Sequence, residues 1–238
     1  MRTAYTVFRN LYNVRKMTMK LVLASGSQRR RELLTMCGYD YEIIVSNADE
    51  TIDENDPENF VRALSFRKAK DVFDRLFAAG RRDFAVIGSD TVVALQKEGG
   101  TKPVIIGKPK DAEDAVRILS MLSGKTHRVF TGVSVIADIP DENAAAQCSI
   151  REKAEIQTEC SITEVTFETL SPDEITDYVN SGDPLDKAGS YGIQGPFGMF
   201  VREIRGNYFT VIGMPIPVLY KMLKKIGILP HGFYECIE

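Results

Sequence analysis

The segment 21–34, LVLASGSQRRRELL, constrains the fold most, because it changes from the pattern of a buried strand to that of a helix within a few residues. Leu21–Ala24 is a short apolar run, a turn of small side chains follows, and Arg29–Met36 reads as a helix that Gly38 ends. A strand that leads through a tight turn into a helix is the basic unit of α/β proteins. The sequence therefore predicts a sheet with helices packed on it.

The same alternation continues along the chain, with hairpins inserted. Apolar or alternating runs predict further strands at Tyr41–Val45, Phe84–Ile87, Thr91–Leu95, Val104–Ile106, Arg128–Ala137, Glu155–Phe167, Phe200–Ile204 and Tyr208–Val211. Helical patterns predict helices at Pro57–Phe77, at Ala112–Leu122 with Asp111 as N-cap, after a Ser171–Glu174 capping box, and at Ile216–Lys225. No linker divides the chain, so we expect one α/β domain with a mixed sheet covered by helices.

Composition and charge exclude several classes of protein. The net charge of −3 provides no overall basic field for nucleic acid. The two histidines exclude a histidine-rich metal site, and the four cysteines have no zinc-binding spacing. No stretch approaches the roughly 20 apolar residues of a membrane span. We expect a cytoplasmic protein with reduced thiols and no membrane or nucleic-acid partner.

Residues 1–19 differ in composition from residues 20–238, which we expect to form the domain. The first 20 residues contain five basic residues and no acidic one. This composition fits a mitochondrial transit peptide, and it equally fits a plain extension or a start site placed upstream of Met17 or Met19.

Four stretches carry residues suited to chemistry. The turn before the first helix would leave backbone N–H groups free for an anion, and Arg29 and Arg30 would bind the same anion; the alternative is a solvated basic first turn. Ser25 and Gln28 in this turn have capping-box spacing. Asp90 lies between two apolar strand segments, where a carboxylate needs a cation or a metal, unless it caps a turn.

The other two stretches are a lysine turn and a glycine-rich loop. Lys108 follows an apolar strand in a Gly-Lys-Pro turn, although a surface lysine is the plainer interpretation. The loop 184–195, PLDKAGSYGIQG, contains an Asp186–Lys187 charge pair and Gln194, whose amide suits a base edge; alternatively, the loop's own hydrogen bonds account for these residues. Cations, a carboxylate and glycine turns at strand ends together indicate phosphate chemistry with a metal.

Together these stretches resemble the Maf family of nucleoside triphosphate pyrophosphatases. The matching segments, in the family's order, are LASGSQRRRELL, SNADE, FRKAK, IGSDTVV, GKP, LSGKTHRVFTGV, PLDKAGSYGIQG and VIGMP. The resemblance implies hydrolysis of a nucleoside triphosphate to the monophosphate and pyrophosphate, with a divalent cation, Mg²⁺ or Mn²⁺, as cofactor. It also implies an elongated, twisted mixed sheet similar to that of inosine triphosphate pyrophosphatases, and a homodimer.

The resemblance also implies roles for individual residues. Asp90 corresponds to the catalytic acidic residue, which activates water or holds the metal, and Glu50 is a further expected metal ligand. The expected phosphate-binding residues are Ser25, Arg29, Arg30, Lys68 and Lys108. Arg29, Thr91 and Gln194 match the positions tied to base choice in the dTTP and UTP branch.

Four readings of function stay open at this stage. The first is hydrolysis of dTTP and UTP in cleansing the nucleotide pool. The alternatives are a 7-methyl-GTP-type pyrophosphatase of the same family and a nucleotide-binding regulator of cell division with little catalysis. The fourth is nucleic-acid binding through Arg29–Arg31, which the acidic net charge and the lack of interleaved aromatic and basic residues disfavour. The chain departs from the family at Gln28, where proline is usual, and in a long segment 140–155. Arg31 falls on a variable position and receives no expected role.

Overall fold

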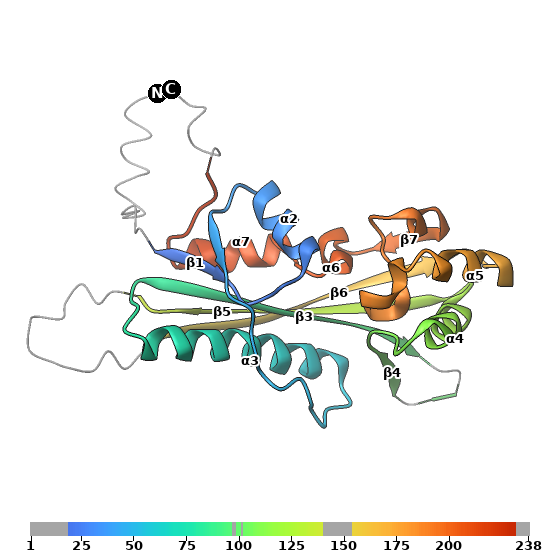
Figure 1. Ribbon diagram of the computed structural model, residues 1–238, viewed down its shortest axis with the longest axis horizontal. Coiled ribbons are helices and arrows are strands. Elements are labelled where there is room, and N and C mark those ends of the chain that lie inside the picture. Colours follow the sequence, from blue (N-terminus) through green and yellow to red (C-terminus); the bar gives the residue numbers. More distant parts are fainter. Residues whose placement is uncertain (1–18, 97–98, 101, 140–153, 232–238) are drawn as a thin grey trace, which may run out of the picture.

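The computed structural model describes residues 19–96, 99–100, 102–139 and 154–231, and contains a seven-stranded twisted sheet (Figure 1). The strand order is β2-β1-β3-β5-β6-β7, with β4 paired to β3. The strands are β1 Lys20–Leu23, β2 Tyr41–Ile43, β3 Phe84–Gln96, β4 Pro103–Ile106, β5 Thr126–Ala137, β6 Glu155–Phe167 and β7 Val201–Arg205. The pairs β1–β2 and β1–β3 are parallel and the others antiparallel, which confirms the mixed α/β sheet.

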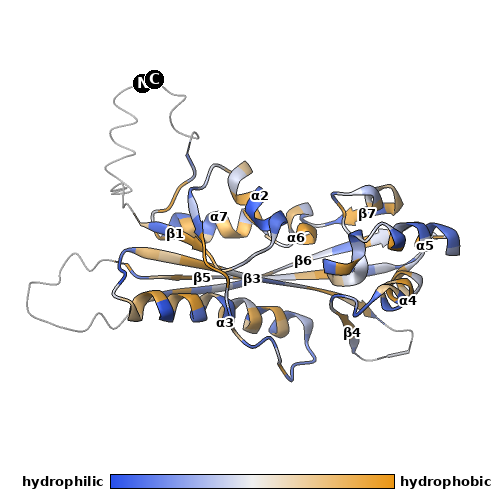
Figure 2. Ribbon diagram, in the orientation of Figure 1, coloured by the Kyte–Doolittle hydropathy of each residue, from blue (hydrophilic) through white to orange (hydrophobic). Residues whose placement is uncertain are grey.

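Helices cover both faces of the sheet. They are α2 Gln28–Met36, α3 Pro57–Ala78, α4 Ala112–Leu122, α5 Pro172–Asn180, α6 Tyr208–Ile212 and α7 Ile216–Lys225. Helix α3 packs on one face, while α2 and α7 pack on the opposite face (Figure 1). Helices α4 and α5 enclose a further apolar cluster at the other end of the long strands. Hydrophobic and hydrophilic residues alternate along α3 in Figure 2, and its buried residues recur about every three or four positions, as expected of a helix with one buried face.

The helix ends test three expected caps. The Asp111 side chain accepts a hydrogen bond from the Asp114 backbone N–H at the start of α4, and Ser171 and Glu174 form both bonds of a capping box, so these two predictions are confirmed. The Ser25–Gln28 capping box does not form. Ser27 is the N-cap of α2, and Gln28 Nε2 instead donates to Glu32 Oε1 at 2.8 Å.

Two predicted strand regions differ from the structure. Phe84–Ile87 and Thr91–Leu95 belong to one continuous strand, β3, because Asp90 has a cationic partner and does not interrupt the pairing with β5. The strand predicted at Tyr208–Val211 is the short helix α6. Its β-branched and aromatic residues favour a strand, but the Asn207 side chain caps Phe209 N–H and a left-handed glycine ends the helix.

Several expectations concern segments outside the described residues. The extension 1–19 lies there except for Met19, as do nearly all of 140–155 and the cysteines at 148 and 236. Cys37 and Cys160 are free thiols. Within the described ranges, no helix has the length and apolar character needed to cross a bilayer.

Candidate active site

The candidate site lies at an interruption of the sheet beside β3. Strand β1 pairs with β3 as far as Ile87, and β4 pairs with the same side of β3 from Val93 onward. Between them, in the described strand pairings, Gly88–Val92 pairs only with β5. Asp90 and Thr91 therefore occupy a gap between two strand ends. Because successive strand residues point to opposite faces, the gap presents Asp90 toward α3 and Thr91 toward α2.

Helix α3 reaches Asp90 because two glycines let it lie directly on the sheet. A Cβ added at Gly88 would be 2.1 Å from the Ser65 carbonyl oxygen, and one at Gly132 would be 2.2 Å from that of Val61. Lys68 follows Ser65 by three residues on the same face of the helix. The close contact thus directs the Lys68 ammonium at the strand.

Two carboxylates converge on that ammonium. Lys68 Nζ lies 2.6 Å from Asp90 Oδ1 and 3.0 Å from Glu50 Oε1. Asp90 is buried at 8% exposure, and the Lys68 side chain is 12% exposed, whereas Glu50 is largely open to solvent. The charge that Asp90 requires in this position is therefore supplied by Lys68.

These carboxylates also fit the donor set of a hard divalent cation. Within the described ranges, no group of three or more His, Cys, Asp or Glu side chains is arranged to hold a metal. Mg²⁺ is commonly bound through one or two carboxylates together with substrate phosphates. Asp90 and Glu50, whose oxygens lie within 3.0 Å of one shared cationic nitrogen, match that pattern.

Arg30 joins the turn after β1 to the gap from the opposite face. Its Nε donates to the Gly213 carbonyl at 2.9 Å, Nη1 to Ser25 Oγ at 3.1 Å and Nη2 to Thr91 Oγ1 at 3.4 Å. Burial lowers the pKa of Arg30, while the negative charge of Asp90 raises it. A guanidinium stays charged under both influences. Arg30 therefore orients Ser25 and Thr91 and adds a half-buried positive charge near Asp90.

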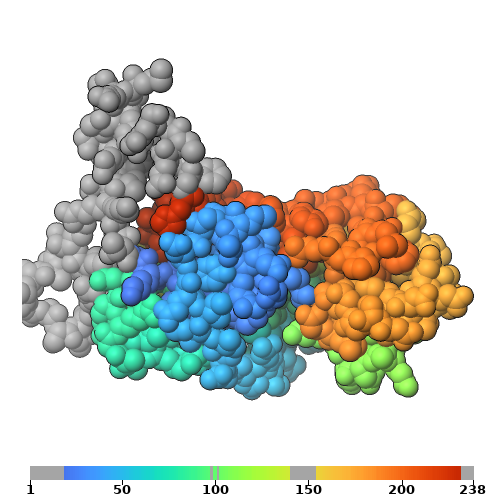
Figure 3. All heavy atoms as spheres, turned by 45° about the horizontal axis from the view of Figure 1, so that its top comes forward, coloured from blue at the N-terminus to red at the C-terminus, as the bar shows by residue number. Residues whose placement is uncertain are grey.

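Arg29 faces the glycine-rich loop instead. Its Nη1 lies 3.3 Å from Asp186 Oδ2, so α2 and the loop lie side by side, as the adjoining blue and orange surfaces in Figure 3 illustrate. Lys187 Nζ binds Asp186 at 2.7 Å and Asp183 at 3.0 Å. Burial raises the pKa of Asp186, but the Lys187 hydrogen bond and the charges of Arg29, Lys187 and Lys108 outweigh it and lower the pKa.

The Gly-Lys-Pro turn and the loop are tied together. Gly189 N–H donates to the Gly107 carbonyl at 3.0 Å, which places Lys108 beside the loop. Lys108 and Gln194 are both exposed. The structure thus brings Ser25, Arg30 and Thr91 together in one cluster, Glu50, Lys68 and Asp90 in a second, and Arg29 with Lys108 near Asp186 in a third.

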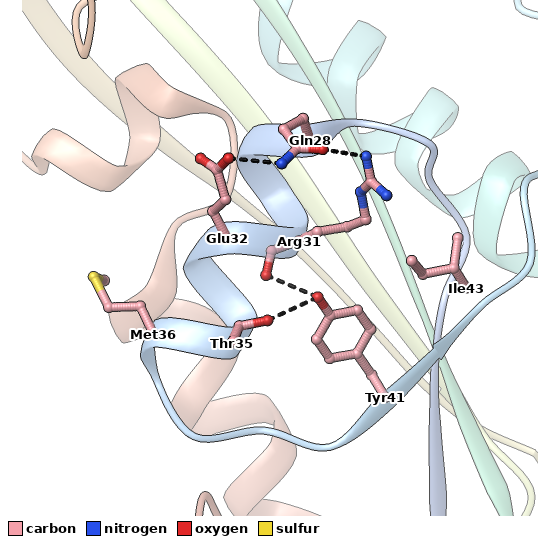
Figure 4. A pocket seen from close by; sticks show the side chains of 7 residues that line it. All are labelled: Gln28, Arg31, Glu32, Thr35, Met36, Tyr41 and Ile43. Carbon is pink, nitrogen blue, oxygen red and sulfur yellow. Dashed lines mark hydrogen bonds between the residues drawn. The ribbon is translucent and has the colours of Figure 1, made fainter.

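Arg31 lies away from these clusters. It lines an open pocket of about 510 Å³ between α2 and β2 (Figure 4). Its guanidinium contacts Gln28, and its carbonyl accepts a hydrogen bond from the Tyr41 hydroxyl at 2.9 Å. The three consecutive arginines of the sequence therefore have three different surroundings, and the expectation of no site role for Arg31 agrees with its position.

Sequence reasoning missed several residues that build the site. Gly88 and Gly132 look like ordinary strand glycines, and the Gly213 carbonyl has no side-chain signal, although it lies within the VIGMP segment. Tyr178 was also missed. Its hydroxyl donates to Asp183 Oδ2 at 2.5 Å and accepts from Gly192 N–H at 3.0 Å.

These features define an α/β protein that holds a cluster of cations and paired carboxylates in an interrupted sheet. The sequence matches the Maf-like protein family over residues 20–226. The chain belongs to this family, which confirms the resemblance found in its motifs.

Relatives match the chain over nearly their whole length. A dTTP/UTP pyrophosphatase of Agathobacter rectalis is 40% identical, with 88% of this chain and 98% of the relative covered. Proteins of the same name from Bacillus thuringiensis subsp. konkukian and Clostridium beijerinckii are each 42% identical, with 88% and 87% of this chain and 96% and 100% of the relatives covered. Among solved structures, the Staphylococcus aureus Ham1 protein matches with a TM-score of 0.45 and 14% identity, covering 87% of this chain and 98% of that chain.

Proposed function

We propose that this chain is a nucleoside triphosphate pyrophosphatase that hydrolyses dTTP and UTP to the monophosphate and pyrophosphate. The names of relatives at 40–42% identity support this function. The observation that carries it is the buried Lys68–Asp90 pair, 2.6 Å apart, in the gap beside β3. A role in removing unwanted pyrimidine nucleotides from the pool is part of the proposal.

The proposed reaction uses the charges of the three clusters. Phosphoryl transfer depends mainly on positioning and charge neutralisation. Arg29, Lys68 and Lys108 would offset the charge of the triphosphate, and Arg30 would hold Ser25 toward it. Asp90 would orient the attacking water and accept its proton. The water oxygen then bonds to the α-phosphorus as the bond to the pyrophosphate oxygen breaks.

A divalent cation is part of the proposal. Asp90 and Glu50 are the residues that would hold Mg²⁺ or Mn²⁺, and the ion would neutralise charge on the phosphate oxygens and help to activate water. Lys68 would then move its hydrogen bonds from these carboxylates toward the phosphates.

Base choice is assigned to the loop side of the site. The exposed Gln194 amide can donate and accept at once, which suits a pyrimidine with a 4-oxo group. Arg29 and Thr91 would also contribute to base choice. Arg29 does so through its ion pair with Asp186 in the loop, and Thr91 through the hydrogen bond that it accepts from Arg30.

Pyrophosphate release from a panel of nucleotides tests the function. We expect UTP and dTTP to exceed CTP, GTP and 7-methyl-GTP by at least about tenfold in kcat/KM, because the amide must match the base edge. Activity should require Mg²⁺ or Mn²⁺ and disappear with a chelator. Preference for 7-methyl-GTP would favour the alternative branch, and tight nucleotide binding without turnover would favour a regulator.

The adjacent arginines provide a matched pair of variants. Arg30→Lys should lower kcat/KM for UTP by about tenfold or more, because a compact ammonium cannot reach all three acceptors of the planar guanidinium, the Gly213 carbonyl, Ser25 Oγ and Thr91 Oγ1. Arg31→Lys should stay within about twofold of wild type, since Arg31 faces the outer pocket. Equal losses in the two variants, measured by steady-state kinetics, would contradict this assignment.

Two further expectations stay predictions. They are the homodimer and the compartment, either the cytoplasm or, through residues 1–19, the mitochondrion. The basic composition of those residues supports the second compartment.

A further inference from the structure

The glycine-rich loop contains a strained turn that the proposed reaction does not use. Gly189 and Ser190 have φ values of 74° and 60°, in the left-handed region. This conformation costs a residue with a Cβ about 1–2 kcal/mol. Ser190 is completely buried, and its hydroxyl has no hydrogen-bond partner in the described part of the chain. Contacts elsewhere must therefore hold the turn in this shape.

The first such contacts press the turn against β3. A Cβ at Gly189 would be 2.6 Å from Val93 Cγ2, so this position excludes any larger residue. Gly189 N–H is bound by the Gly107 carbonyl, and Ser190 N–H by that of Lys187 at 3.0 Å. These contacts fix the start of the turn but not its continuation toward Gln194.

A buried polar contact holds the continuation at Tyr191. The Tyr191 hydroxyl lies 3.1 Å from His127 Nε2 on β5. Tyr191 is 6% exposed and His127 2% exposed. Both rings pack against Phe167, with ring centroids 4.6 Å from His127 and 4.8 Å from Tyr191, and Phe197 lies 5.3 Å from Tyr191. These aromatic neighbours offer the two polar groups no comparable hydrogen-bond partner, so the hydroxyl and the imidazole bind each other.

The state of the imidazole strengthens this conclusion. Burial lowers the pKa of His127 to about 3, so the ring is neutral at physiological pH and carries a single N–H. Its other nitrogen, Nδ1, has no hydrogen-bond partner among the described residues. Tyr191 therefore supplies the polar contact that this buried ring has. An apolar residue would fill the same space without the free-energy cost of burying a polar ring, so packing alone does not explain a histidine here.

We propose that His127 and Tyr191 are positioning residues that fix the loop Tyr191–Gln194 for base recognition. The proposal rests on the proposed function, because it assigns Gln194 to the base. The Tyr178 hydroxyl accepts a hydrogen bond from Gly192 N–H, so polar contacts hold two adjacent residues, Tyr191 and Gly192, shortly before Gln194. Because His127 and Tyr191 are both buried, we expect neither to touch the phosphates. Replacing them should therefore weaken recognition of the base and leave the polyphosphate part of the site unchanged.

Paired variants test the proposal. His127→Met removes the polar contact, and so does Tyr191→Phe, whereas His127→Gln retains an amide near the position of Nε2. We expect the first two to raise KM for UTP about fivefold, because a buried hydrogen bond is lost, and to reduce the preference for UTP over CTP. Inhibition by tripolyphosphate, which has no base, should be unchanged. His127→Gln should stay within about twofold of wild type, and the double variant His127→Met with Tyr191→Phe should lose no more than either single one.

Hydrogen exchange separates this proposal from the proposed function. Amides of residues 191–194 should exchange faster in His127→Met and Tyr191→Phe than in wild type and His127→Gln. Unchanged exchange, an unchanged KM, or an equal weakening of UTP and tripolyphosphate would overturn the positioning role. A wild-type chain that releases no pyrophosphate from any nucleotide contradicts the proposed function instead, and the exchange rates then decide whether the pair fixes the loop.

Discussion

Asp90→Asn is expected to lower kcat for pyrophosphate release from UTP by about 10³-fold or more while the protein stays folded. The amide has almost the same shape and still accepts a hydrogen bond from Lys68, but it has no negative charge and cannot take a proton from water. The largely buried Lys68 ammonium, 2.6 Å from the substituted group, would keep the exposed Glu50 as its anionic partner among the described residues. Single-turnover kinetics at saturating Mg²⁺ measure this loss directly.

A matched control separates catalysis from general charge removal. Glu164 lies on β6, and its half-exposed carboxylate pairs at 3.2 Å with the largely exposed Arg128, an interaction worth little at the surface. Glu164→Gln should leave both kcat and the thermal midpoint nearly unchanged. Asp90→Asn with wild-type turnover would remove Asp90 from its catalytic role, and an unfolded variant would identify the residue as a structural counter-ion of Lys68.

The sequence predicted the local elements well because their signals are local. The apolar periods, the Asp111 cap and the Ser171–Glu174 capping box each depend on a few neighbouring residues. Tyr208–Val211 was wrong for the same reason. Its strand-forming composition was weighed without the Asn207 side chain and the left-handed Gly213 that make it a helix.

The site could be predicted only as a set of residues and not as an arrangement. The motifs identified Asp90, Lys68 and Arg30. They did not show that Lys68 and Arg30 approach β3 from opposite faces of the sheet, at a gap between β1 and β4. That gap depends on where distant strands end. Arg30 illustrates the difference, because its charge suggested phosphate binding, whereas three of its five N–H groups donate to protein groups.

Gly132→Ala is expected to destabilise the protein by about 3 kcal/mol or more and to impair activity together with stability. Gly132 pairs directly with Asp90 across β3 and β5, and an added Cβ would lie 2.2 Å from the Val61 carbonyl oxygen and 2.5 Å from its carbon. Both are backbone atoms of α3, so no side chain can rotate away. The helix must move off the sheet, and Lys68 moves with it.

Other glycines can show that the loss of stability comes from the close contact between β5 and α3. Gly88→Ala should act similarly, since its Cβ would meet the Ser65 carbonyl at 2.1 Å, whereas an added Cβ at Gly107 meets no atom within 4 Å. Gly107→Ala should therefore change the urea midpoint little, which serves as the stability control. If Gly132→Ala retained the wild-type midpoint, α3 would tolerate displacement and the Lys68–Asp90 distance would not depend on this contact. If it lost stability but retained kcat, the 2.6 Å contact would stabilise the fold without being needed for turnover.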